Sequence, residues 1–290
     1  MFFLNNYPFT GYHTGISLKK ESFDMSIRMI AIDLDGTLLH DDMTISSYSR
    51  DVIKKASEEG FKVVIATGRM WNSARKKMEV LELGNVPVVC YTGAWIMMGE
   101  TGEAIYQEGM DPKFASKALL WAKEEGLKVT AFWDDKIYME GPDGTEIKYR
   151  KYRTVQPEFL GAAFFNPPKK VTRIVFSDPD PAVRLEIRKA IENKFGDAVD
   201  VVFPGDDFVD MHKSGINKAT AVKYLADQAG ISSSEIMAFG NTENDVPLLR
   251  MAGESYAVAN ADKIALDAAK AVCASNEEDG VAHMIEKLLK

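Results

Sequence analysis

The chain has 290 residues, 46% of them hydrophobic and 27% charged, and a formal net charge of −8. This composition is that of a globular protein, and it excludes a chain that is disordered throughout or built from low-complexity repeats. The length is sufficient for two domains. Because nucleic-acid binding depends on Lys and Arg neutralising phosphates, the acidic balance argues against a nucleic-acid partner.

The termini and the cysteines carry further expectations. No apolar run approaches the roughly 20 residues of a membrane-spanning helix, and the first residues lack the pattern of a secretory signal. We therefore expect no membrane partner and a cytoplasmic location. Cys90 and Cys273 lie in apolar runs, which is typical of buried free thiols. Residues 1–24 precede a second methionine, Met25, and are interpreted as an N-terminal arm; the alternative is an ordered packing segment.

After Met25, short apolar runs alternate with amphipathic stretches. Strands are expected at 29–33, 61–66 and 87–91, with helices at 47–59 and 71–83. The strands are rich in Val and Ile without polar alternation, which favours a parallel sheet covered on both faces. The pattern returns near the C-terminus, so both ends of the chain are interpreted as halves of one α/β sheet. The expected elements there are helices at 217–229 and 246–252, strands at 235–239, 256–258 and 271–273, and two further helices flanking the last strand.

The middle of the chain has a different pattern. A hairpin is expected over 127–140, turning at Asp134 and Asp135, and short alternating strands with tight turns indicate an antiparallel α+β module. This module is placed at 108–205, as an insertion between core segments 25–107 and 206–290. Its other expected elements are helices at 114–125 and 181–195 and strands at 170–177 and 199–203.

Two carboxylates directly follow the first strand, in Asp33-Leu34-Asp35-Gly36-Thr37. In an open α/β sheet, ligands bind beyond the carboxyl ends of the strands. Two acids at that edge can share a divalent cation, or one can attack phosphorus while the other handles protons. Gly36 permits a tight turn with exposed amides. The alternative interpretation is a simple Asp-Gly turn at a strand end.

Two other positions have the chemistry to hold a phosphate. Thr67-Gly68-Arg69 ends the second strand, where a hydroxyl and a helix start suit phosphate binding; the alternative is a helix N-cap. Lys218 begins a predicted helix and could balance a phosphoryl group and an aspartate together; the alternative is a solvated lysine.

A fourth strand end is dense in oxygen ligands. Gly240-Asn241-Thr242-Glu243-Asn244-Asp245 follows an apolar strand, and the alternative interpretation is a polar turn that caps the next helix.

Taken in order, these four motifs resemble those of the haloacid dehalogenase superfamily, and more closely its Cof-type phosphatases. The resemblance runs from about Met25 to the end of the chain. It implies a Rossmann-like parallel-sheet core with an α+β cap domain inserted between the second and third motifs.

The resemblance also implies roles for individual residues. Asp33 would attack the phosphoryl group and form an aspartyl phosphate. Asp35 would protonate the leaving alcohol and then activate water. Thr67 and the amide of Gly68 would hold phosphoryl oxygens, and Lys218 would stabilise the charge.

Further ligands follow from the same resemblance. Magnesium is the implied cofactor, with Asp33, Asp35, Asn241 and Asp245 as its expected ligands. The expected substrate-binding residues are Gly36, Thr67, Gly68, Arg69, Thr92, Gly93, Lys218 and Asn244.

The chain departs from the family pattern at two positions. Asn241 occupies the place of a metal-binding Asp, so magnesium affinity is expected to fall. Thr92, in Tyr91-Thr92-Gly93-Ala94, stands where Asn is common near the substrate phosphate.

The resulting expectation is a magnesium-dependent phosphatase of small phosphate esters, such as sugar or cofactor phosphates, acting as a monomer or homodimer. A phosphotransferase related to phosphomannomutases and a weakly active phosphate-binding regulatory module are the alternatives. In the cap, Trp133, Tyr138 and Phe165 either stack on the substrate or form the cap's own core. The run 149–153 either steers an anionic substrate or is a solvated surface.

Overall fold

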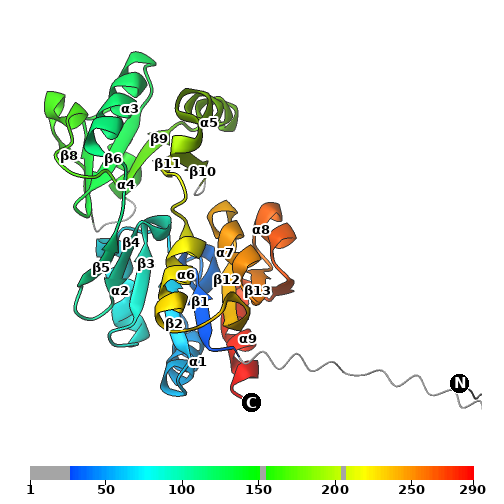
Figure 1. The fold of residues 1–290 in the computed structure, drawn as a ribbon. Coiled ribbons are helices and arrows are strands. Elements are labelled where there is room, and N and C mark those ends of the chain that lie inside the picture. The colour runs from blue at the N-terminus through cyan, green and yellow to red at the C-terminus, as the bar shows by residue number, and fades with distance from the viewer. Residues whose placement is uncertain (1–26, 151–154, 204–206) are drawn as a thin grey trace, which may run out of the picture.

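The computed structural model describes residues 27–150, 155–203 and 207–290. These residues form two lobes, a core domain and a smaller cap domain above it in the view of Figure 1. The expected N-terminal arm at 1–24 lies outside the described residues. No helix in the described ranges is long and apolar enough to cross a membrane. Cys90 and Cys273 are buried free thiols, as predicted.

The core domain is built on an eight-stranded sheet with the order β14-β13-β12-β1-β2-β3-β4-β5. All neighbouring pairs from β14 to β3 are parallel, which confirms the expected parallel sheet. The antiparallel strands β4 and β5, which sequence analysis missed, extend one edge. The core elements are β1 (Met29–Ile32), α1 (Ser47–Glu58), β2 (Lys62–Ala66), α2 (Trp71–Leu81), β3 (Pro87–Cys90), β4 (Trp95–Met98), β5 (Ala104–Gln107), α6 (Lys218–Gln228), β12 (Ile236–Gly240), α7 (Val246–Met251), β13 (Glu254–Val258), α8 (Lys263–Ala268), β14 (Ala271–Cys273) and α9 (Gly280–Leu288).

Helices cover both faces of this sheet. In β1, Ile30 and Ile32 belong to the hydrophobic cluster formed with α1, α2 and α9, whereas Met29 and Ala31 belong to the cluster formed with α6 and α7. Successive side chains of a strand point to opposite faces, so a strand buried on both faces must be apolar at every position. This requirement explains the unbroken apolar sequence of β1.

The cap domain contains a six-stranded sheet with the order β10-β11-β9-β6-β7-β8, packed against α3 and α5. The hairpin of β6 and β7 confirms the expected turn at Asp134 and Asp135. The stacked rings of Trp133 and Tyr138 belong to the cap's hydrophobic cluster together with Phe165, so these aromatic residues form the cap's own core. The cap elements are α3 (Pro112–Glu124), β6 (Val129–Trp133), β7 (Lys136–Met139), α4 (Glu146–Arg150), β8 (Glu158–Phe159), β9 (Arg173–Ser177), α5 (Pro181–Phe195), β10 (Val199–Val202) and β11 (Phe208–Lys213).

The cap ends later in the chain than the sequence pattern predicts. Strand β11 pairs antiparallel with β9 and β10, so the cap sheet continues to Lys213 rather than ending at residue 205. The predicted boundary at residue 205 itself lies outside the described residues. At the other connection, a Cβ on Gly109 would lie 2.7 Å from the carbonyl oxygen of Val171, so the segment that enters the cap runs close to the cap segment that precedes β9.

The cap is bonded to the carboxyl edge of the core sheet at three places. In each place, a cap side chain bonds a core loop or helix start that follows a parallel strand. The contacts are the Asp135 carboxylate with the Asn72 amide (2.8 Å) and the Tyr91 hydroxyl (2.8 Å), the Arg173 guanidinium with the Gly68 carbonyl (3.2 Å), and the Arg188 guanidinium with the Glu243 carboxylate (2.9 Å).

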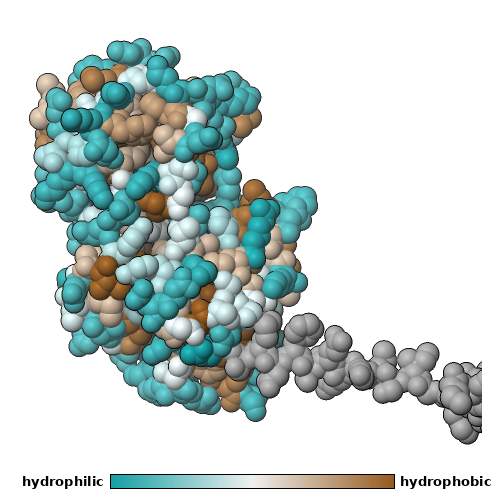
Figure 2. All heavy atoms as spheres, viewed as in Figure 1, coloured by the Kyte–Doolittle hydropathy of each residue, from teal (hydrophilic) through white to brown (hydrophobic). Residues whose placement is uncertain are grey.

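Figure 2 shows one face of both lobes, on which hydrophilic residues predominate. The large hydrophobic clusters of the described residues lie inside the two domains.

We expect Gly93→Ala to destabilise the core more than Gly60→Ala. Both glycines have positive φ, +112° and +98°, so both substitutions carry the left-handed cost of about 1–2 kcal/mol. A Cβ on Gly93 would also lie 2.2 Å from the Asn217 carbonyl oxygen, whereas a Cβ on Gly60 meets nothing within 4 Å. Urea unfolding followed by circular dichroism should show a further loss of about 1–3 kcal/mol for Gly93→Ala. Equal losses would contradict this close approach.

Candidate active site

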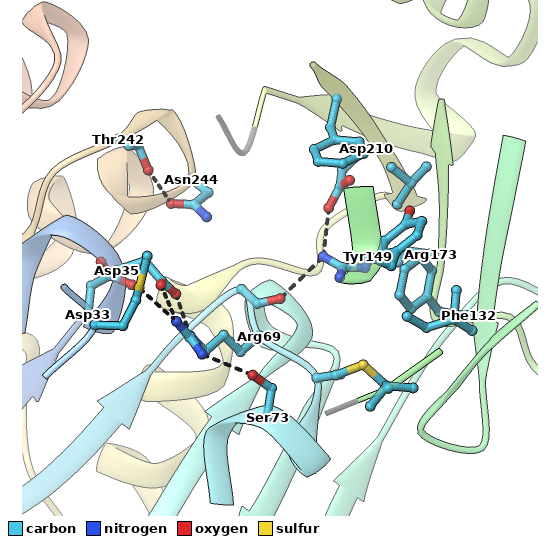
Figure 3. Close-up of a pocket in the computed structure, with 17 residues that line it drawn as sticks. Asp33, Asp35, Arg69, Ser73, Phe132, Tyr149, Arg173, Asp210, Thr242 and Asn244 are labelled. Carbon is cyan, nitrogen blue, oxygen red and sulfur yellow. Dashed lines mark hydrogen bonds and ion pairs between the residues drawn. The ribbon is translucent and has the colours of Figure 1, made fainter. Parts of the chain in front are cut away.

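The four motifs meet at the carboxyl edge of the core sheet. Strands β1, β2 and β12 are adjacent and parallel, so the loops that follow them leave the sheet side by side. The Asp33 amide continues this ladder with a hydrogen bond to the Phe239 carbonyl (3.2 Å), which fixes the first motif beside the fourth. Figure 3 shows the Asp33 and Asp35 side chains beside the loop that carries Thr242 and Asn244.

A buried lysine links two carboxylates at the centre of this edge. The Lys218 ammonium donates hydrogen bonds to Asp33 Oδ1 and to Asp245 Oδ1, both at 2.6 Å. Its side chain is 1% exposed. Helix α6 begins at Lys218, because Asn217 and Thr220 form a reciprocal capping box that ends the preceding extended chain. The predicted meeting of Asp33 and Lys218 is therefore found, and the solvated-lysine alternative is wrong.

The charges in this cluster shift one another's pKa values. Burial and the neighbouring Asp245 carboxylate raise the pKa of Asp33 to about 7, while Lys218 opposes the shift. Burial alone would lower the pKa of Lys218, but the carboxylates of Asp245 and Asp33 outweigh burial and raise it above its usual value. Lys218 therefore stays protonated between the two buried carboxyl groups.

Asp245 serves mainly to position its neighbours. Its side chain is 0% exposed, and its Oδ2 accepts hydrogen bonds from the amides of Asn241 (2.9 Å) and Thr242 (3.1 Å). Because Oδ1 accepts from Lys218, both oxygens already have donors. Asp245 was predicted as a metal ligand; in the structure its oxygens instead fix the fourth-motif loop and the lysine.

The residues expected to hold a phosphate converge around Gly68. A Cβ placed on Gly68 would lie 3.4 Å from both Asn244 Nδ2 and Thr92 Oγ1, so these side chains surround its backbone. Thr67 Oγ1 accepts a hydrogen bond from the Arg69 amide (3.1 Å), which leaves its own proton to donate. Asn244 Oδ1 accepts from the Thr242 hydroxyl (2.9 Å), which likewise leaves the amide nitrogen as a donor. Hydroxyl and amide donors grouped in this way suit an anion.

Arg69, which was expected to bind substrate, lines the cavity and forms an ion pair with Asp35. Its Nε and Nη2 donate to the two carboxylate oxygens of Asp35 at 2.7 and 2.5 Å. Its Nη1 donates to the Ser73 hydroxyl at 2.9 Å, which orients the guanidinium (Figure 3). A bidentate pair of this kind fixes both partners. Asp35 remains 45% exposed and reaches the cavity beside Asp33.

The residues near Asn241 fit a divalent cation. Among the described residues, no three His, Cys, Asp or Glu side chains are grouped as a metal site would require. Asn241 supplies another kind of oxygen, because its Oδ1 is buried and has no hydrogen-bond partner in the described part of the chain. Its Nδ2 faces Gly36, where a Cβ would lie 2.5 Å away. An orphaned acceptor beside the Asp33 loop matches the oxygen ligands that magnesium prefers.

The third strand ends in a strained turn that also belongs to the site. Tyr91, Thr92 and Gly93 all have positive φ, at 51°, 54° and 112°. A β-branched residue in the left-handed region is an outlier, and such strain is concentrated at functional sites. The turn places Thr92 beside Gly68 and brings Gly93 against the Asn217 backbone, next to Lys218.

A cavity of about 300 Å³ lies between the two domains, with Asp33 and Asp35 at its core side. Its cap side includes the ion pair of Arg173 and Asp210 (2.9 Å), which sequence analysis missed. Asp210 on β11 lies opposite Val175 on β9. Arg173 is two residues before Val175 on the same face of the strand, so its side chain can reach Asp210 diagonally across the two strands. The sequence held one signal for this pair: Arg173 and Asp210 are charged residues in otherwise largely apolar strands, β9 and β11.

Tyr149 was predicted within a solvated or substrate-steering run. The structure places its ring inside the cavity wall, buried against Phe132 and Phe208. Residues 151–153 of that run lie outside the described residues.

Comparison with known proteins agrees with this geometry. The family model described as haloacid dehalogenase-like hydrolase matches residues 30–285. The phosphatase YwpJ of Bacillus subtilis is 27% identical over 291 residues, covering 91% of this chain and 100% of that protein. The TM0651 structure from Thermotoga maritima is 28% identical with a TM-score of 0.77, covering 90% of this chain and 97% of that one.

A second solved structure, a haloacid dehalogenase-like hydrolase from Bacillus subtilis, is 25% identical with a TM-score of 0.80, covering 90% and 99% of the two chains. The fold and the site thus define a hydrolase with a Rossmann-like parallel-sheet core and an inserted cap. The chain belongs to the haloacid dehalogenase-like hydrolase family.

We expect Lys218→Met to destabilise the protein by about 3–5 kcal/mol, because it leaves Asp33 and Asp245 as buried charges without a counterion. Lys223→Met is the matched control on the same helix, since Lys223 is 48% exposed and forms an i,i+4 pair of small energetic value. The midpoint of urea unfolding measures both. A loss for Lys218→Met no larger than for the control would contradict the importance of the buried cluster.

Proposed function

We propose that this protein is a magnesium-dependent phosphatase that hydrolyses small organic phosphate monoesters through an aspartyl phosphate on Asp33. The observation that carries this proposal is the Lys218 bridge between Asp33 and Asp245, beside a group of donors around Gly68. This bridge orients the Asp33 carboxylate and compensates its negative charge. Membership in the haloacid dehalogenase-like hydrolases and similarity to a protein named as a phosphatase support the same activity.

In the first step, a carboxylate oxygen of Asp33 attacks phosphorus as the bond from phosphorus to the ester oxygen breaks. The leaving alkoxide takes a proton from Asp35, whose carboxyl group lies in the same cavity. Both oxygens of Asp35 are held by Arg69 in the structure, so this role requires one of those bonds to open and the released oxygen to take up a proton from solvent before the ester is cleaved.

In the second step, water attacks the phosphorus of the aspartyl phosphate, and Asp35 accepts the water proton. The bond between phosphorus and the Asp33 oxygen breaks, which regenerates the carboxylate and releases inorganic phosphate. Lys218 stays bonded to Asp33 Oδ1 and offsets the negative charge that returns to it.

Positioning of the phosphoryl group falls to the donors around Gly68. The Thr67 hydroxyl, the Gly68 amide and the Asn244 amide nitrogen would donate to its oxygens. Phosphoryl transfer depends mainly on such positioning and on charge stabilisation. Magnesium, held by the Asp33 carboxylate, the Asp35 carbonyl and Asn241 Oδ1, would neutralise phosphate charge when bound.

A second function is favoured by the presence of Asn at position 241, where the family pattern has a metal-binding Asp. A neutral amide brings no charge to the metal, and a weakly active phosphate-binding module is the function that would follow from poor magnesium affinity. The next two experiments separate this alternative from a phosphatase.

Asp33→Asn should lower the rate of phosphate release from an ester panel by roughly 10³-fold or more, because the amide is a poor nucleophile. Asp51→Asn is the control: Asp51 lies on the exposed face of α1, and the substitution should leave the rate unchanged. Release of inorganic phosphate at saturating magnesium is the measurement. Equal activity of Asp33→Asn and wild type would exclude the covalent mechanism.

Asn241→Asp should lower the magnesium concentration for half-maximal activity by about tenfold, because a carboxylate replaces a neutral oxygen ligand. Calorimetric titration of magnesium gives the same comparison without substrate. Asn85→Asp, which alters an exposed loop amide bonded to Glu100 and Thr101, is the matched control. An unchanged magnesium affinity in Asn241→Asp would show that this side chain is not a ligand.

A further inference from the structure

The cavity between the domains has two chemically different halves. The core half presents the charged and polar groups of the first, second and fourth motifs. The cap half is mostly apolar, and its described lining residues are Phe132, Ile137, Tyr149, Val155, Val175, Phe208 and the Arg173–Asp210 pair. A substrate that spans the cavity therefore meets polar groups at its phosphate end and a largely apolar wall at its other end (Figure 3).

Flat groups dominate the apolar wall. The rings of Tyr149 and Phe208 are stacked, with centroids 6.0 Å apart and planes at 29°, and Phe132 meets Tyr149 edge-on at 6.1 Å. The Arg173 guanidinium lies over the Phe132 ring at 4.3 Å. These groups pack mainly on one another, since Phe132 is 1% and Tyr149 6% exposed, and together they give the cap half a rigid apolar wall.

Polar groups in the cap half are few. Among the described cap residues that line the cavity, charged side chains come only from the Arg173–Asp210 pair. Both hydrogen bonds of Arg173 use Nη1, and its buried Nε has no partner in the described part of the chain. The described residues of this half offer few partners to the hydroxyls of a sugar, and each unpaired buried hydroxyl opposes binding. A ring with a single acceptor on its edge needs only the Arg173 guanidinium.

Gly68 connects this half to the phosphate site. Its carbonyl accepts from Arg173 Nη1 at 3.2 Å, while its amide belongs to the donor group proposed for the phosphoryl oxygens. The Arg173 guanidinium and the proposed phosphoryl group would therefore contact opposite ends of the same residue, Gly68. A cavity of about 300 Å³ matches a compact ring attached to the phosphate by a short linker.

We propose that the cap half of the cavity is a subsite for a flat conjugated ring, with Phe132 and Tyr149 in the apolar wall beside it and Arg173 at an edge acceptor. The preferred substrate is then a phosphate monoester whose alcohol carries such a ring, in preference to a sugar phosphate. This inference rests on the proposed phosphatase function for the orientation of the substrate.

Two primary-alcohol esters test the subsite with matched phosphate chemistry: pyridoxine 5′-phosphate, which carries a ring, and glucose 6-phosphate, which carries a sugar. Binding of each to Asp33→Asn is measured by calorimetry with magnesium, so that no turnover interferes. We expect at least tenfold tighter binding of the ring ester. Phosphate release from the same esters by the wild-type protein is measured in parallel.

Phe132→Leu, made in the Asp33→Asn protein, removes the ring but keeps an apolar side chain, and it should reduce the preference about tenfold. Phe159→Leu is the control, because Phe159 is on cap strand β8, is 49% exposed and does not line the cavity. Thermal unfolding of both variants verifies folding, and Tyr149→Leu provides a second variant if Phe132→Leu unfolds.

The outcomes separate the two proposals. Equal or tighter binding of glucose 6-phosphate, a ring preference that survives loss of the Phe132 and Tyr149 rings, or no detectable binding of the ring ester would overturn the subsite. Absence of phosphate release from either ester, together with a ring preference in binding, would overturn the phosphatase function and leave the subsite supported.

Discussion

The site depends on one buried ammonium group. Lys218 is buried and donates to Asp33 and Asp245 at 2.6 Å each. Without a cation between them, two carboxylates bound to the same point would repel each other. Burial makes this repulsion cost more free energy, because water no longer screens the charges. Through Asp245, the same interaction fixes the amides of Asn241 and Thr242 and hence the loop that closes the other side of the pocket. The same buried lysine therefore positions both the nucleophile Asp33 and the loop of the fourth motif.

The cap completes the site by bonding to the loops that carry the chemistry. Asp135 reaches the start of α2 and the Tyr91 hydroxyl, and Arg173 reaches the Gly68 carbonyl. Closure of the cap excludes water and strengthens the electrostatic interactions inside. Because Arg173 also lines the apolar half of the cavity, the contact that holds the cap on the core lies beside the region proposed for the leaving group. Substrate selection and closure therefore share residues.

The site residues that follow strand ends could be predicted from the sequence. The contacts that depend on which strands are neighbours, and in which register, could not. Asp33, Thr67 and Asn244 were identified because each follows an apolar strand, and parallel strands bring their carboxyl ends to one edge. The pair of Arg173 and Asp210 requires knowing that β9 and β11 are neighbours, and antiparallel pairing of distant segments has no local signal.

The same reason explains the predicted end of the cap at residue 205. Strand β11 pairs with β10 and also with β9, which lies beyond α5 in the chain, and neither pairing has a local signal in the sequence. The bidentate pair of Arg69 with Asp35 was also missed, because its partners are 34 residues apart in sequence. Magnesium binding, the substrate and the oligomeric state remain predictions.

The most direct test of this account is to look for the phosphoryl group on the protein. Wild-type protein is mixed with a hydrolysed ester and magnesium, quenched in acid within one turnover, digested, and examined by mass spectrometry. The account predicts a phosphoryl adduct on the peptide that contains Asp33, and its loss when Asp33 is replaced by Asn. Phosphate release without any adduct at Asp33, or an adduct on another residue, would contradict it.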